Sequence, residues 1–145
     1  MARERARYLV IGGFAVALHG LPRVTEDIDL AISPTLLNAR RVLRAMEKAG
    51  YGTATMIRPE ELVETEIVVC NDRLRVDLLT RPKGLAFPSA WRRRETRVVH
   101  GVRVHFASLE DLIAAKDAAG RPVDLADLVR LREALERRKV GRRDS

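Results

Sequence analysis

The sequence predicts an α/β (α+β) fold in which a small mixed β-sheet carries helices packed on it. Short apolar runs of strand length alternate along the chain with longer amphipathic stretches of helical period. Hydrophobic residues make up 46% and charged residues 32%, which provides a core and a solvated surface. The 145 residues suit one compact domain, which we expect over residues 1–136, with 137–145 as a basic, flexible tail.

The expected order is strand, helix, strand, helix and two strands, followed by a β-hairpin and two helices. Turn and breaker residues separate the elements, chiefly glycine, proline and asparagine. The expected strands cover 8–11, 27–32, 64–70, 74–80, 97–99 and 102–106, and the expected helices cover 14–18, 34–49, 89–95, 109–119 and 122–136.

Local signals justify several of these boundaries. Ser33 fits an N-cap followed by Pro34 at the first helical position, and Ser108 with Asp111 forms a near capping box. His100-Gly101 fits the turn of a hairpin. In the last helix, four leucines at helical spacing are expected to face inward: Leu125, Leu128, Leu131 and Leu135.

Charge and cysteine content narrow the classes of partner and compartment. The net charge of +7 favours anionic partners such as nucleic acid or nucleotides. The single cysteine, Cys70, cannot form an intrachain disulfide and is expected to be a small buried hydrophobe. The basic N-terminus before residues 8–18 resembles a signal peptide, but Gly12-Gly13 interrupts the apolar stretch. With no run long enough to cross a membrane, we expect a cytoplasmic protein.

Asp27 and Asp29 are the strongest candidates for chemistry. In a strand, residues two apart point the same way, so both carboxylates are expected on one face while Ile28 and Leu30 face the core. Side-by-side carboxylates repel one another unless a cation or a proton lies between them. Hard oxygen ligands of this kind suit Mg²⁺, which takes one or two carboxylates together with substrate phosphates.

Asp77 stands alone in the apolar run Val76–Leu79, so it needs a partner. If its strand lies beside residues 27–30, the three acids converge on a metal site. The alternative is an ion pair with a neighbouring arginine, Arg73 or Arg75, and for Asp77 by itself the two readings weigh about equally.

Gly12, Gly13 and Lys116 are candidates for contact with phosphates. A glycine pair between a strand and a helix lets phosphate approach the backbone, but it is also a common tight turn. Lys116 shares a helix face with Leu109, Leu112 and other apolar residues. It therefore either extends outward to solvent or reaches a buried anion.

Together these residues resemble the polymerase-beta-like nucleotidyltransferase superfamily. The resemblance rests on Gly12-Gly13, the run Arg23 to Leu30 and the later Asp77, and it spans roughly residues 8–131. The segment from Gly12 to Gly20, with the later run 110–128, is most similar to the small bacterial branch of minimal nucleotidyltransferases and AbiEii-type toxins. The family motif usually reads Gly-Ser, whereas this chain has Gly13 in place of the serine.

The resemblance implies a two-magnesium enzyme that uses a nucleoside triphosphate such as ATP. Asp27, Asp29 and Asp77 would be both metal ligands and catalytic residues, with Asp77 placed to help deprotonate an acceptor hydroxyl. Four further residues would bind the nucleotide: Gly12, Gly13, Arg23 and Lys116. The acceptor would be RNA such as tRNA, or protein, and the branch implies a toxin–antitoxin setting.

Two other functions fit the same residues. The chain could be a non-catalytic subunit that binds nucleotide or RNA, which the Gly13 departure favours, or a magnesium phosphohydrolase, which lacks an obvious nucleophile. The arginine run 92–94 beside Trp91 fits either RNA contact or, at about two to one, a solvated charge run. Because 145 residues leave little room for an acceptor-binding domain, we expect a partner protein, such as an antitoxin, or a homo-oligomer.

Overall fold

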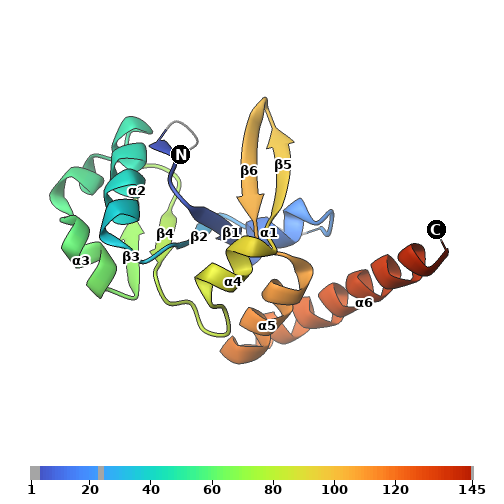
Figure 1. Cartoon of the computed structure of the whole chain (residues 1–145). Helices are drawn as coiled ribbons and strands as arrows, with labels where there is room; N and C mark the ends of the chain where they lie inside the picture. The colour runs from blue at the N-terminus through green and yellow to red at the C-terminus, as the bar shows by residue number, and fades with distance from the viewer. Residues whose placement is uncertain (1–3, 23–24, 145) are drawn as a thin grey trace.

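A six-stranded mixed sheet forms the centre of the molecule, as a computed structural model that describes residues 4–22 and 25–144 shows (Figure 1). The strand order is β3-β4-β2-β1-β6-β5. The predicted α/β class with a mixed sheet is therefore confirmed. The strands are β1 (Tyr8–Ile11), β2 (Ile28–Ile32), β3 (Ile67–Cys70), β4 (Val76–Leu79), β5 (Glu95–Val99) and β6 (Val102–Phe106).

The central strands β1, β2 and β4 bring together segments that are far apart in the sequence. β2 runs antiparallel to β1 and parallel to β4. In this register Ile11 lies opposite Asp29, and Asp29 lies opposite Asp77. Directly paired residues point to the same face of a sheet, so this register places both carboxylates on one face.

Two groups of helices lie towards opposite ends of the sheet, while α1 and α4 lie near its middle (Figure 1). α2 packs against α3 and the short 3₁₀ helix η2 at the end near β3, while α5 packs against α6 at the other. The sequence predicted neither η2 nor α3, because both are short and lack a long periodic pattern. The helices are α1 (Gly12–Leu18), α2 (Leu36–Lys48), η2 (Gly52–Met56), α3 (Pro59–Glu64), α4 (Phe87–Arg92), α5 (Leu109–Ala119) and α6 (Pro122–Asp144).

The core is aliphatic, as the low aromatic content requires. Leu9 and Leu78 from the sheet are fully buried together with Leu62 from α3 and Leu109 from α5. Cys70 is buried in the same core, and burial raises the pKa of its thiol. The interpretation of Cys70 as a buried hydrophobe is confirmed.

The start of α2 differs from the prediction by two residues. Thr35, rather than Ser33, is the N-cap, and its hydroxyl accepts a hydrogen bond from the backbone N–H of Asn38 at 3.2 Å. Ser33 is held outside the helix, because its N–H donates to the carbonyl of Arg7. Pairing with the chain next to β1 therefore continues as far as Ser33, and the helix begins only after Pro34.

Two other local signals are confirmed. Ser108 caps α5 by accepting from the N–H of Asp111 and donating to the Asp111 carboxylate. At the β5–β6 turn, His100 and Gly101 have φ values of 48° and 77°, the left-handed pair that a two-residue hairpin turn requires.

The last helix begins at Pro122 as predicted, but its buried face differs. Leu128 and Leu131 point inward, whereas Leu125 is exposed, so its predicted inward position is wrong. Asp124 and Asp127 occupy the inward face because they meet the side chain of Lys116 on α5.

Residues 137–144 continue α6 as a helix that extends away from the body (Figure 1). The guanidinium of Arg138 donates to Glu95 at 3.1 Å and to Nδ1 of His19 at 3.1 Å. The basic segment is thus helical and linked to β5, and its flexibility stays a prediction. In the described ranges, no helix is long and apolar enough to cross a membrane.

Candidate active site

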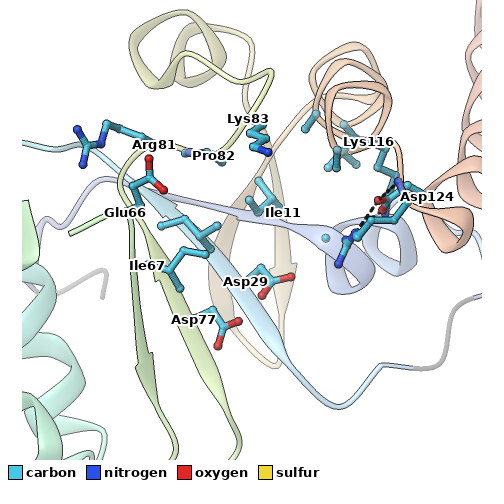
Figure 2. Close-up of a pocket in the computed structure, with 16 residues that line it drawn as sticks. Ile11, Asp29, Glu66, Ile67, Asp77, Arg81, Pro82, Lys83, Lys116 and Asp124 are labelled. Carbon is cyan, nitrogen blue, oxygen red and sulfur yellow. Dashed lines mark hydrogen bonds and ion pairs between the residues drawn. The ribbon is translucent and has the colours of Figure 1, made fainter.

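A cavity of about 330 Å³ opens on the face of the sheet that carries Asp29 and Asp77 (Figure 2). Asp29 from β2 and Asp77 from β4 lie side by side at its floor. Lys83 from the loop after β4 and Lys116 from α5 line its wall. The cavity is therefore bounded by acidic groups on the sheet and basic groups from the elements above it.

Asp29 carries the clearest electrostatic perturbation in the cavity. Burial raises the pKa of its carboxyl to about 6, with further contributions from the negative charges of Asp77 and Asp27. The positive charges of Arg121 and Arg75 oppose this shift without cancelling it. The site therefore carries excess negative charge, which a cation would relieve.

Asp77 has an ion-pair partner, Arg75, two residues earlier. Arg75 Nε donates to Asp77 Oδ1 at 2.9 Å, and Arg75 Nη2 donates to Asp77 Oδ2 at 3.3 Å. The ion-pair alternative for Asp77 is thus realised, although the Asp77 carboxylate also borders the cavity beside Asp29. Because the Arg75 side chain is 45% exposed, its guanidinium can move to solvent at little desolvation cost.

Asp27 lies directly before β2 and does not line the cavity. Its charge still acts on Asp29, as the pKa of Asp29 shows. Within residues 4–22 and 25–144, no three His, Cys, Asp or Glu side chains are grouped closely enough to hold a metal ion. The structure therefore brings Asp29 and Asp77 together, and Asp27 stands outside this pair.

Gly12 lies where the carboxylate of Asp29 approaches the backbone. Its φ of 67° falls in the left-handed region, and a Cβ at this position would lie 2.4 Å from Asp29 Oδ2. Any side chain there would displace the carboxylate. Gly12 also lines the cavity, whereas Gly13 lies in the first turn of α1 and does not.

Lys116 reaches a buried anion, one of the two alternatives that the sequence left open. Its Nζ lies 2.9 Å from Asp127 Oδ2 and 3.6 Å from Asp124 Oδ1, and all three side chains are buried. Asp124 also accepts from Arg121 at 2.7 Å, which holds the pKa of Asp124 below its usual range against the effect of burial. Arg23 lies outside the described residues.

Three basic residues that the sequence reasoning did not select also line the cavity: Arg81, Lys83 and Arg121. The first two follow β4, and only the sheet order brings that loop to the rim. Arg121 joins α5 to α6, and its charge acts on Asp29. No local pattern marks these residues, because their common location depends on the tertiary fold.

The donor set of the cavity fits a divalent cation. Asp29 and Asp77 provide carboxylate oxygens from neighbouring strands in direct register, and Mg²⁺ is commonly held by one or two carboxylates plus substrate phosphates and water. The pKa of Asp29 stays raised, chiefly by burial and then by the neighbouring acids, although the charges of Arg121 and Arg75 oppose the shift. Phosphate oxygens would in turn find Lys83, Arg81 and Arg121 at the rim.

A family described as "Nucleotidyltransferase of unknown function (DUF6036)" matches residues 1–136. The chain belongs to this family. No match was found among curated proteins. Membership agrees with the resemblance to nucleotidyltransferases in the sequence and accounts for the paired acids on adjacent strands of a mixed sheet. Nucleotidyltransferases generally use a nucleoside triphosphate and a divalent metal, which the acidic floor and basic rim of the cavity suit.

Proposed function

We propose that the protein is an active, magnesium-dependent nucleotidyltransferase that moves a nucleoside monophosphate from a triphosphate such as ATP to a hydroxyl acceptor. The observation that supports this most strongly is the in-register pair Asp29 and Asp77 at the floor of a cavity with a basic rim. The acceptor hydroxyl belongs to RNA such as tRNA, or to a protein.

Asp29 and Asp77, with Asp27 from the adjacent turn, would hold two Mg²⁺ ions. When bound, such ions offset phosphate charge and favour in-line displacement at phosphorus. Lys83, Arg81 and Arg121 bind the outer phosphates of the triphosphate. In this proposal Lys116 and Arg23 add positive charge nearby, and Gly12 and Gly13 leave room at the backbone.

Asp77 orients the acceptor hydroxyl and accepts its proton. The acceptor oxygen then forms a bond to the α-phosphorus, the bond from that phosphorus to the bridging oxygen breaks, and pyrophosphate leaves with the electron pair. In this step Arg75 must release Asp77, which its exposed guanidinium permits.

The proposal places the protein in the AbiEii-type branch, with a toxin–antitoxin role, on the strength of the resemblance in residues 12–30 and 110–128. The protein acts in the cytoplasm beside a partner protein or as a homo-oligomer. The alternative function is a non-catalytic subunit that binds nucleotide or RNA. The Arg75–Asp77 ion pair and the position of Asp27 outside the Asp29–Asp77 pair favour this alternative.

The deciding experiment measures transfer of label from each α-labelled nucleoside triphosphate to bulk tRNA or lysate protein in the presence of Mg²⁺. We expect transfer by the wild-type protein and a loss of at least about 100-fold in Asp29→Ala, because charge stabilisation at phosphorus is removed. Asp117→Ala, which removes an exposed aspartate on α5, is the matched control and should keep full activity.

Two results would contradict the transferase assignment. Nucleotide binding without transfer to any acceptor favours the non-catalytic subunit. Release of free phosphate without transfer favours the phosphohydrolase. If Asp29→Ala still transfers label, the active site does not lie in this cavity.

A further inference from the structure

A second pocket, of about 260 Å³, lies between the chain that enters β1, the end of α4 and strand β6. Basic and aromatic side chains dominate its lining. They are Arg5, Arg7, Tyr8, Trp91, Arg103 and His105. The proposed transfer uses none of these residues.

The pocket is strongly positive. Three of its lining residues are arginines with exposed side chains, and among the residues that the structure describes no carboxylate lines it. Burial lowers the pKa of His105, and the charges of Arg94 and Arg103 lower it further. Arg94 therefore adds a fourth positive charge close to the pocket.

The Trp91 ring holds two guanidinium groups beside the pocket. The Cζ atoms of Arg94 and Arg7 lie 4.0 Å and 5.6 Å from the centre of this ring. Trp91 is itself fixed by stacking on Phe87 at 5.8 Å and by an edge contact with His105 at 5.4 Å. The positions of the Arg7 and Arg94 guanidinium groups are therefore restricted before an anion binds, which lowers the entropy cost of binding.

The run Arg92–Arg94 divides into separate roles. Arg93 is bound to Asp111 at 2.7 Å and connects α4 to α5, whereas Arg94 lies over Trp91. A freely solvated run would leave all three side chains without fixed partners. The ion pair of Arg93 and the cation–π contact of Arg94 instead hold these two side chains in defined positions.

The second pocket and the catalytic cavity are both bordered by strand β1. Tyr8 at the start of β1 lines the second pocket, and Ile11 at its end lines the catalytic cavity. The strand between these two residues spans roughly 10 Å. A nucleic acid strand of a few nucleotides is therefore long enough to connect the second pocket with Asp29 and Asp77.

We propose that this pocket binds the phosphate backbone of a single-stranded nucleic acid, the acceptor of the transfer reaction. The inference rests on the proposed function for the identity of the acceptor. Guanidinium groups bind phosphate through paired, charge-assisted hydrogen bonds, and such contacts depend little on sequence. Because the proposal concerns binding alone, the affinity for nucleic acid can be measured without any nucleotidyl transfer taking place.

The test measures the fluorescence anisotropy of labelled 12-nucleotide RNA and DNA strands of mixed sequence, over a range of salt concentrations. We expect Arg7→Ala/Arg103→Ala to weaken binding on the order of tenfold and to reduce the slope of log K against log salt by about 1.4 for two lost phosphate contacts. A loss of affinity for either the RNA or the DNA strand supports the proposed binding site. A difference in affinity between RNA and DNA shows whether ribose or deoxyribose is preferred.

The matched control is Arg58→Ala/Arg132→Ala, which removes two exposed arginines that do not line the pocket. It should change the affinity less than threefold, and Arg103→Lys should keep only part of the binding, because it preserves the charge but loses the paired hydrogen bonds. Thermal unfolding of each variant confirms that it is folded.

The outcomes separate this inference from the proposed function. Equal losses in the pocket variant and the control would show diffuse surface charge and would overturn the pocket, even if transfer is observed. Binding that depends on Arg7 and Arg103, in a protein that transfers no label, would support the pocket and remove its link to transfer.

Discussion

Asp29 lies where burial and two neighbouring acids act on one carboxyl group. Its carboxylate occupies the space beside Gly12 that a Cβ would fill, and it faces Asp77 across two parallel strands. The fold therefore holds a negative charge in an unfavourable environment, which raises the pKa of Asp29 to about 6. A bound cation would convert this cost into binding free energy.

Replacing the carboxyl of Asp29 by an amide should stabilise the protein while removing its activity. At pH 7.5 Asp29 is ionised and carries the burial penalty, so Asp29→Asn should raise the free energy of unfolding by about 1–2 kcal/mol. The folded-state pKa lies above the unfolded value of about 3.9. The contribution of Asp29 to stability therefore falls as pH rises from about 4 to 6, and the difference in stability between the two proteins should vanish near pH 4.

Urea unfolding at pH 4, 5, 6 and 7.5 measures this difference. Addition of Mg²⁺ at pH 7.5 should then raise the midpoint of the wild-type protein more than that of Asp29→Asn, because ligands that bind the folded state stabilise it. A variant that is less stable than wild type at pH 7.5 would contradict the assigned cause of the raised pKa.

Single residues differ in how far the sequence predicts their surroundings. Alternation is local, and it predicted that Asp29 shares a face with Asp27, but β2 begins only at Ile28 and it is the sheet register that brings Asp29 beside Asp77. The surroundings of Asp77 did not follow from the sequence, because an ion pair with an arginine and a shared metal site are equally compatible with a lone acid. In the structure Asp77 pairs with Arg75 and also lies beside Asp29. Lys116 was equally open, and its partners Asp124 and Asp127 lie on another helix.

At the scale of elements, α5 and α6 are joined by buried charges as well as by leucines. Lys116 from α5 meets Asp124 and Asp127 from α6, which explains why the inward face of α6 includes both acids and leaves Leu125 exposed. A hydrophobic pattern alone cannot predict this face, because polar pairs enter the core only when the partner helix is in place.

Removing the cation from this cluster should destabilise the helix pair. Lys116→Met keeps the length and apolar stem of the side chain but leaves buried carboxylate charge uncompensated, so we expect a loss of about 3 kcal/mol in the free energy of unfolding. Chemical denaturation measures the loss. Lys139→Met, which removes an exposed lysine on α6, is the control and should change stability by less than about 0.5 kcal/mol.

Measuring both stability and the KM for the triphosphate in Lys116 variants distinguishes a structural role of Lys116 from a role in phosphate binding. If its main partner is the α6 acid pair, Lys116→Arg should restore most of the stability because it restores the charge. A Lys116→Met protein with wild-type stability would contradict the importance of the buried cluster. A rise in KM for the triphosphate at unchanged stability would instead assign Lys116 to phosphate binding.

At the scale of the whole molecule, sheet order is the feature that the sequence could not predict. Strand positions and the hairpin turn followed from local patterns, but the order β3-β4-β2-β1-β6-β5 determines which residues meet at the cavity. That order brings Lys83 and Arg81 to the cavity that Asp29 lines, and it places β6, with Arg103, beside β1. Non-local strand pairing is set by the packing of the complete core, which no short segment encodes.

The whole molecule also presents apolar groups on its projecting parts. The β5–β6 hairpin and α6 both extend from the body in Figure 1, and β5 is an edge strand of the sheet. Val98 and Val102 on the hairpin, and Val129 and Val140 on α6, are each more than half exposed. Edge strands and exposed apolar side chains are typical of surfaces that another chain covers.

We therefore expect a homodimer that uses the hairpin. Light scattering after size exclusion should give a mass of twice 16.3 kDa at micromolar concentration. Val102→Asp should shift the mass to that of one chain, because a charge buried at an apolar contact is costly. Met56→Asp alters an exposed apolar residue on η2, away from the hairpin, and should leave the dimer intact. A single-chain mass for the wild-type protein, or dissociation by both variants, would show that the hairpin is not a dimer interface.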